Sequence, residues 1–156
     1  VSNGPGDPAT ADKMVVVVRD VLDARVPFFG ICFGNQILGR ALGLDTFKMK
    51  FGHRGINVPV RNHLTGKIDI TSQNHGFAIA SPSGKENPAG EEFDTDFGRG
   101  IVTHTCLNDN TIEGVALKDG MAYSVQYHPE SAAGPHDANP LFNQFIELMT
   151  EHTPNK

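Results

Sequence analysis

The apolar positions near the start of the chain follow a helical period. Residues at i, i+3, i+4, i+7 and i+8 form a stripe that comprises Met14, Val17, Val18, Val21 and Leu22. This spacing predicts an amphipathic helix with Thr10 as its N-cap and an end near Ala24. The run 15–18 taken alone would favour a strand, but the longer periodicity outweighs it.

A strand, a tight turn and a second helix are predicted next. The continuously apolar segment 26–31 is typical of a strand that is buried on both faces of a parallel sheet, with Pro27 at its start. Residues 35–42 then place one apolar side on a short helix, formed by Ile37, Leu38, Ala41 and Leu42. Gly43 gives this helix a natural C-terminal end.

Short strand-like segments dominate the rest of the chain. Turn residues separate these segments, which cover residues 46–49, 56–60, 67–71, 101–107, 112–117 and 121–126. Asp119-Gly120 predicts a two-residue hairpin between the last two. The stretch 81–100, rich in Pro, Gly and acidic residues, has neither period and predicts a solvated loop without chemistry.

The last predicted element is another amphipathic helix. Asn139 is its expected N-cap, and Pro140 occupies its first position. Its apolar face comprises Leu141, Phe142, Phe145, Leu148 and Met149. No internal repeat interrupts the series, so we expect one domain built around one core.

Composition narrows the class of protein. The chain has 156 residues, about one domain, and 13 Lys and Arg against 18 Asp and Glu give a net charge of -5. This balance argues against nucleic-acid binding, which depends on clustered cations. No apolar run approaches the roughly 20 residues that span a bilayer, so we expect no membrane insertion.

Cysteine usage and the N-terminus bear on the compartment. Cys32 and Cys106 are the two cysteines, too few for a disulfide scaffold in a chain of this size, which favours a reducing, cytoplasmic environment. The first residues have neither the basic nor the apolar region of a signal peptide. They read as a cut through a longer chain.

The segment Gly30-Ile31-Cys32-Phe33-Gly34 is the strongest candidate for chemistry. A nucleophile between glycines at a strand-to-helix turn is typical of a nucleophile elbow. We expect the helix N-terminus to lower the pKa of the Cys32 thiol below its usual ~8.5. The backbone N–H of Phe33 is then placed to stabilise a tetrahedral oxyanion. A small buried cysteine in a tight turn would give the same pattern, so the motif alone leaves both interpretations open.

Tyr127-His128-Pro129-Glu130 follows a predicted strand and offers the partners that a thiol needs. A histidine can take and return the proton of the thiol, and a carboxylate can fix the tautomer of that histidine. Ligands of open α/β sheets bind beyond the carboxyl ends of the strands. His75 is interpreted as a turn residue near the pocket. The other histidines are interpreted as surface or core residues, namely His53, His63, His104, His136 and His152.

The remaining motifs carry little weight alone. The glycines of residues 4–8 would let backbone approach a ligand closely, and residues 73–77 are equally ambiguous. The sequence predicts no metal site, because His53 and His63 lie in different segments and Cys106 lies within a strand. Neither a P-loop nor a G-x-G-x-x-G motif is present, so nucleotide binding by this chain is not expected.

Taken together, residues 30–36 and His128-Pro129-Glu130 resemble the class I, or triad, glutamine amidotransferases, and the resemblance extends over essentially the whole chain. Longer motifs resemble the small, glutamine-hydrolysing chain of carbamoyl phosphate synthetase, at residues 48–55, 73–79 and 134–142. The resemblance implies an α/β fold, with an open, mostly parallel, flavodoxin-like sheet flanked by helices and a smaller antiparallel β portion. It also implies a single amidotransferase domain over residues 1–156 that is incomplete at its N-terminus, and hence a poorly stable chain.

The resemblance further implies hydrolysis of glutamine to glutamate and ammonia. The ammonia would pass to a large synthetase subunit, which would hold ATP, Mg²⁺ and bicarbonate, while this chain would need no cofactor. Cys32 matches the nucleophile that forms a γ-glutamyl thioester, His128 the general base and then acid, and Glu130 its orienter. Backbone N–H groups of Phe33 and Gly4 match the oxyanion hole. The positions that hold glutamine match Gly6, Gln36, Asn74, Gly76 and Phe77.

Two alternatives stay open at this point. The chain would also match, as the second choice, an amidotransferase that serves another synthetase, such as those for GMP or anthranilate, although residues 50–53 and 134–137 favour carbamoyl phosphate. It would also fit a non-catalytic docking module, although an intact set of Cys32, His128 and Glu130 counts against that. Phe33 and Asn35 stand where Leu and His are common in the motif, and neither is expected to affect the chemistry.

Overall fold

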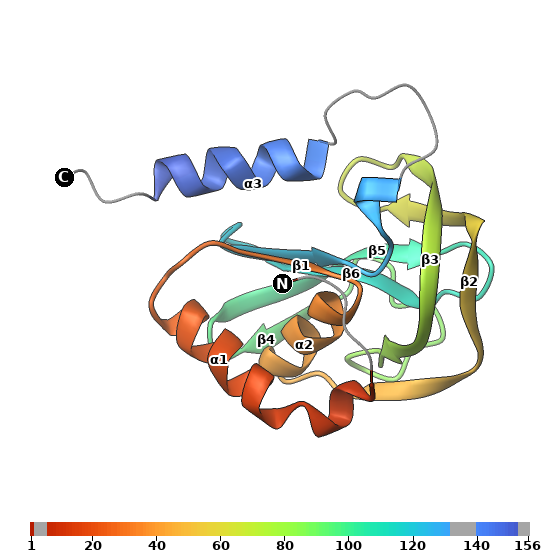
Figure 1. Cartoon of the computed structure of the whole chain (residues 1–156), viewed down its shortest axis with the longest axis horizontal. Helices are drawn as coiled ribbons and strands as arrows, with labels where there is room; N and C mark the ends of the chain where they lie inside the picture. Colours follow the sequence, from red (N-terminus) through yellow and green to blue (C-terminus); the bar gives the residue numbers. More distant parts are fainter. Residues whose placement is uncertain (2–5, 132–139, 153–156) are drawn as a thin grey trace.

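The computed structural model describes residues 1, 6–131 and 140–152. These residues form one seven-stranded sheet in the order β1-β7-β6-β3-β2-β5-β4, with an additional pairing of β6 with β5. Helices α1 and α2 cover one face of the sheet and α3 lies across the other (Figure 1). The elements are η1 (Pro8–Thr10), α1 (Asp12–Asp23), β1 (Phe28–Ile31), α2 (Phe33–Ala41), β2 (Thr46–Asn62), β3 (Ile68–Ile79), β4 (Glu92–Thr95), β5 (Gly98–Cys106), β6 (Ile112–Leu117), β7 (Ala122–Val125), η2 (Pro129–Ser131) and α3 (Pro140–Glu151).

The strand directions do not confirm a mostly parallel sheet. Among the described strands β1 and β7 form the one parallel pair, and the other pairings are antiparallel. Short turns join β2 to β3, β4 to β5, β5 to β6 and β6 to β7, and such turns produce antiparallel neighbours. Val1 extends the parallel part, because its amino group donates to Phe29 O and its carbonyl accepts from Ile31 N, both at 2.8 Å.

Alternate residues of the strands fill two cores, one on each face of the sheet. Phe28 packs with α1 and α2, whereas its neighbour Phe29 packs with α3. The side chains of α2 that were predicted to be apolar are fully buried or nearly so. The predicted apolar face of α3 packs against the second core through Leu141, Phe142, Phe145 and Leu148. Its expected N-cap, Asn139, lies outside the described residues.

Helix α1 begins later and faces a different way than its apolar stripe predicts. Thr10 belongs to η1, where its hydroxyl donates to Asp7 O, and the N-cap of α1 is Ala11. Val18 and Leu22 are buried as predicted, but Val17 is 53% exposed. Packing against α2 decides which face of α1 is buried. The helical period alone does not specify that face.

Two long strands replace the short segments predicted for the centre of the chain. β2 runs through residues 50–55, where irregularities in its pairing with β3 and the positive φ of Gly52 (69°) accommodate the glycines. β3 includes residues 72–79, so His75 lies in a strand and not in a turn. β4 lies within the predicted loop 81–100 and pairs with β5. The first part of β3 lacks apolar alternation because its buried positions hold the polar side chains of Thr71, Gln73 and His75.

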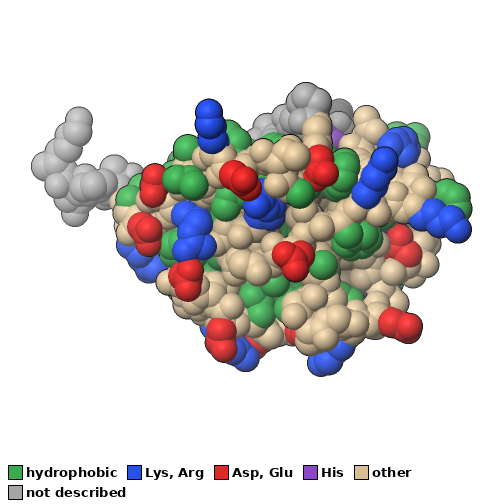
Figure 2. Space-filling model, turned by 90° about the horizontal axis from the view of Figure 1, so that it is seen from below, with side chains coloured by type: hydrophobic (Ala, Val, Ile, Leu, Met, Phe, Trp, Pro, Cys, Tyr) green, Lys and Arg blue, Asp and Glu red, His purple; other side chains and the backbone are tan. Residues whose placement is uncertain are grey.

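Three further features concern the surface charge, one turn and the helices. In the face shown in Figure 2, Lys and Arg side chains are separated by acidic and apolar ones. A hairpin joins β6 to β7 as predicted, but its connection is longer than the predicted two residues, because residues 118–121 separate the strands. The turn closes from Gly120 N–H to Leu117 O at 3.0 Å, with Gly120 at φ 84°. In the described part of the chain, none of the helices has both the length and the apolarity needed to cross a membrane.

Candidate functional site

Cys32 lies at the junction of β1 and α2, in the geometry that the glycine pattern predicts. It is the N-cap of α2 and has φ 55° and ψ -105°, a conformation that L-residues rarely adopt. Its N–H donates to Val125 O at 2.9 Å, which fastens the turn to β7. A Cβ on Gly30 would lie 2.5 Å from Gly34 O, so the sharp turn needs glycine there.

The sulfur of Cys32 is buried among polar partners. Its Sγ lies 3.9 Å from Asn74 O and accepts from Gln126 Nε2 at 3.7 Å. Burial raises the pKa of the thiol, and the charge of Glu130 acts in the same direction, whereas the Phe33 N–H and Gln126 lower it. The predicted lowering of the Cys32 pKa by the helix N-terminus is therefore wrong, because desolvation outweighs the favourable donors.

His128 and Glu130 lie beyond the end of β7, at the same edge of the sheet as Cys32. Ile31 and Val125 are register partners in the parallel pair, so the residues that follow β1 and β7 leave the sheet together. His128 Nδ1 lies 3.0 Å from Glu130 Oε1, and its backbone N–H donates to Ser72 O at 2.9 Å. Among the described residues, the hydrogen bonds of Cys32 Sγ go to Asn74 and Gln126 and not to His128.

A cavity of about 270 Å³ opens beside Cys32. All but one of the positions predicted to hold the substrate line this cavity. These positions are Gly6, Phe33, Gln36, Asn74, Gly76 and Phe77. The exception, Gly4, lies outside the described residues. The structure therefore gathers residues from the N-terminal segment, the elbow and β3 around one cavity.

Residues that the sequence analysis did not assign also line this cavity. Lys48 and Arg54 come from β2, where they are register partners of Phe77 and Asn74. His75, which the sequence placed near the pocket, lines it from β3. Burial lowers the pKa of His75 to about 4. Lys48 and Arg54 belong to a motif that the sequence analysis singled out, but residue type and spacing did not indicate which of its side chains meet the pocket.

Gln126 is a second unassigned residue of the site. Its side chain is fully buried, and its Oε1 accepts from Asn35 Nδ2 and Gln36 Nε2, each at 3.1 Å. Gln36 Nε2 also donates to Phe77 O at 2.8 Å, so α2, β3 and the end of β7 are tied together behind the thiol. In the sequence Gln126 reads only as the last residue of a strand, and no local signal marks it.

Comparisons with known proteins agree with this geometry. The family model for class-I glutamine amidotransferases matches residues 1–148. The chain is 69% identical, over all of its residues, to the carbamoyl phosphate synthase small chain of Corynebacterium glutamicum. It is 74% identical over 96% of its residues to the small chain of Corynebacterium diphtheriae. It spans 38% of the length of each of these relatives.

A solved structure of a glutamine amidotransferase from Thermotoga maritima has the same fold. It covers 96% of this chain and 60% of its own length, with a TM-score of 0.60 and 18% sequence identity. The nucleophile-elbow geometry, the hollow beside it and the family match over residues 1–148 lead to one assignment: the chain belongs to the class I glutamine amidotransferases.

Proposed function

We propose that this chain hydrolyses glutamine to glutamate and ammonia and that the ammonia serves carbamoyl phosphate synthesis. The observation that carries the proposal is the cavity in which Cys32 meets the residues predicted to hold glutamine. The names of relatives that are 69–74% identical favour the carbamoyl phosphate branch over amidotransferases for GMP or anthranilate.

In this proposal Cys32 is the nucleophile and His128 is its base. Because burial raises the pKa of Cys32, the resting group is the thiol, and it must lose its proton during attack. His128 takes that proton as sulfur bonds to the amide carbon of glutamine, and returns it to the departing nitrogen, which leaves as ammonia. Water then attacks the γ-glutamyl thioester, His128 takes a proton from the water, and glutamate leaves as the thiol is restored.

The groups around Cys32 suit the other needs of this reaction. Glu130 accepts from His128 Nδ1 in the tautomer that leaves Nε2 free to take a proton. The Phe33 N–H faces the sulfur and is a donor for the tetrahedral oxyanion, together with the N–H of Gly4 in the family pattern. Lys48 and Arg54 bring positive charge to the cavity wall, which complements the α-carboxylate of glutamine.

We further propose the setting of the reaction. The partner is a carbamoyl phosphate synthetase large subunit that holds ATP, Mg²⁺ and bicarbonate, while glutamine hydrolysis itself uses only side chains and backbone N–H groups of this chain. The chain is proposed to be a single cytoplasmic amidotransferase domain, and neither nucleic acid nor membrane is proposed as a partner.

The test is ammonia release from glutamine by the purified chain, with and without the large subunit from Corynebacterium glutamicum. Cys32→Ser is the inactive variant, and Cys106→Ser is the matched control because Cys106 lies fully buried in β5. We expect turnover that the large subunit stimulates, that Cys32→Ser abolishes and that Cys106→Ser retains. A folded chain without turnover in the presence of the large subunit would favour the docking-module alternative.

A further inference from the structure

A buried carboxylate away from the thiol lacks a full set of partners. Glu113 on β6 is fully buried, and its Oε2 has no hydrogen-bond partner among the described residues. Its Oε1 lies 3.0 Å from His53 Nδ1 on β2 and 4.0 Å from His75 Nε2 on β3. A buried carboxylate that is incompletely paired is costly, so these groups call for an explanation.

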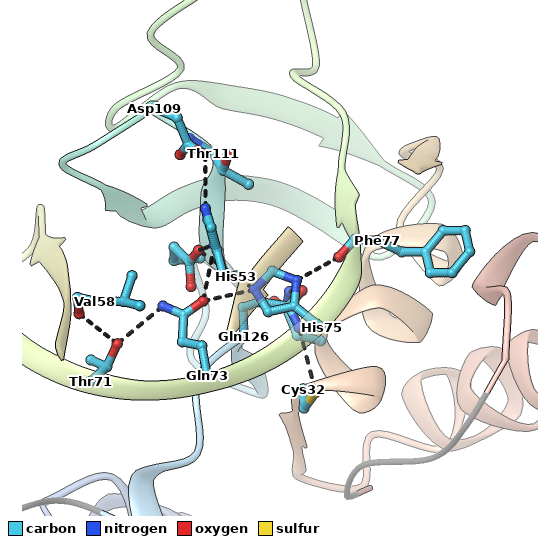
Figure 3. Close-up of polar contacts among 12 residues, drawn as sticks. Cys32, His53, Val58, Thr71, Gln73, His75, Phe77, Asp109, Thr111 and Gln126 are labelled. Carbon is cyan, nitrogen blue, oxygen red and sulfur yellow. Dashed lines mark hydrogen bonds and ion pairs between the residues drawn. The ribbon is translucent and has the colours of Figure 1, made fainter. Parts of the chain in front are cut away.

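Hydrogen bonds fix the orientation of the neighbouring Gln73 amide. Thr71 Oγ1 donates its only proton to Val58 O at 2.8 Å, so it must accept from Gln73 Nε2 at 3.0 Å. Gln73 Oε1 therefore points the other way, at 3.1 Å from His53 Nδ1 and 2.7 Å from His75 Nε2 (Figure 3).

The outer nitrogens of both histidines are occupied. His75 Nδ1 donates to Phe77 O at 2.8 Å, and His53 Nε2 donates to Asp109 Oδ2 at 2.8 Å. In a neutral ring each inner nitrogen then carries a lone pair. With both rings neutral, those lone pairs face the oxygens of Gln73 and Glu113, so four acceptor atoms converge. A proton on His53 Nδ1, which Glu113 and Asp109 favour, is what a bound cation would displace.

We propose that this cluster is a binding site for one divalent transition-metal ion of the zinc class, ligated by His53 Nδ1, His75 Nε2 and a Glu113 carboxylate oxygen, with Gln73 Oε1 at the fourth position. Neutral imidazoles with a carboxylate are a common donor set for zinc. Ligands at about 2.1 Å from a tetrahedral ion lie about 3.4 Å apart. His53 Nδ1 lies 3.0 and 3.1 Å from its two oxygen neighbours, and His75 Nε2 lies 2.7 Å from Gln73 Oε1 and 4.0 Å from Glu113 Oε1. Side-chain shifts of less than about 1 Å would bring these atoms to the tetrahedral spacing.

The surroundings match those of known metal sites. A histidine ligand usually donates its other N–H to a carboxylate or a backbone carbonyl, which sets the tautomer and aims the ring. Asp109 does this for His53 and Phe77 O does it for His75. An ion here would join β2, β3 and β6. It would lie behind the wall of the glutamine cavity, because His75 belongs both to the cluster and to the cavity wall. The prediction of no metal site considered His53 only beside His63 and Cys106, whereas this cluster joins His53 to Gln73 and Glu113, which lie 20 and 60 positions away in the sequence.

The test uses the 156-residue chain purified in a chelator, with Zn²⁺ as the probe in calorimetric titration and native mass spectrometry. We expect one ion per chain. Asp109→Asn should weaken binding roughly 10- to 100-fold, as for other outer partners of ligating histidines, and Glu113→Gln should weaken it further. His152→Gln, which changes an exposed histidine of the same chain, should leave the affinity unchanged.

Two further measurements keep the result decisive. Thermal unfolding followed by circular dichroism, without metal, shows whether each variant folds, and added Zn²⁺ should raise the Tm of the wild type but not of folded Glu113→Gln. Co²⁺ absorption distinguishes the proposed site from one that uses a thiolate, since Cys106 lies near His53 and Asp109. If the folded wild type binds no Zn²⁺, the proposal is overturned. A protonated His53 would then be the group that bridges Glu113 and Gln73. Equal affinity in Glu113→Gln, or a thiolate-to-cobalt band, also overturns the proposal.

Discussion

Gln126 donates a hydrogen bond from Nε2 to the sulfur of Cys32 at 3.7 Å, across 94 positions of the sequence. The same amide accepts from Asn35 and Gln36 through Oε1, so its orientation is fixed by two donors. The environment of the thiol is therefore set by a residue that is neither in the elbow nor in the proposed triad.

Gln126→Leu should destabilise the chain by about 2–4 kcal/mol, because it leaves the buried amides of Asn35 and Gln36 without their shared acceptor. Urea unfolding measures the change. Gln144→Leu on the exposed side of α3 is the matched control and should change stability by less than about 0.5 kcal/mol. Equal stability of the two variants would show that the amide network contributes little.

The positive φ of Cys32 predicts an inverted order of two substitutions. Glycine normally costs about 0.5–1 kcal/mol relative to alanine, but at φ 55° and ψ -105° alanine retains a strain that glycine avoids. Cys32→Gly should therefore be more stable than Cys32→Ala, by about 1–2 kcal/mol. Thermal unfolding of the two variants, both without the thiol, decides this, and a more stable alanine variant would contradict a strained elbow.

Glu130→Gln should reduce glutamine turnover less than Cys32→Ser does. Glutamine retains a hydrogen bond to His128 Nδ1 but removes the charge that stabilises the imidazolium. We expect a loss that is smaller by about 10- to 100-fold than that caused by losing the nucleophile. Steady-state ammonia release gives both values, with Glu147→Gln on α3 as the control. Equal losses would assign Glu130 a more direct part in the reaction.

Stability should fall as the pH is lowered from about 6.5 toward 4, in part through His104. Burial lowers the pKa of His104 to about 4, below the value of about 6.5 in the unfolded chain. The unfolded state therefore binds the extra proton first, and the stability that neutral His104 contributes is present above pH 6.5 and lost on acidification. Urea unfolding at pH 7, 6, 5 and 4.5 measures the slope.

His104→Gln should have a shallower slope than the wild type over that range, whereas His152→Gln should follow the wild type. His75, whose pKa is also lowered to about 4, keeps part of the slope in both variants. A slope that His104→Gln leaves unaltered would mean that His104 titrates alike in the folded and unfolded chains.

Glycine positions and the spacing of apolar side chains determined several local elements of this protein. Glycines around Cys32 specified the elbow because a close backbone approach admits no Cβ, and the apolar run before it specified a buried strand. Residues 33–41 and 112–117 folded as their periods predicted. The motifs at residues 30–36 and 73–77 also identified most of the cavity wall, since each motif stays together when its segment folds.

Only the tertiary structure decided what those segments meet. The parallel register of Ile31 with Val125 brings His128 to the edge where Cys32 lies, and pairing between distant strands leaves no local trace. The antiparallel majority of the sheet and the buried face of α1 were likewise fixed by neighbours in space. The cluster of His53, His75 and Glu113 arose in the same way, because the burial of a polar side chain depends on partners that other strands supply.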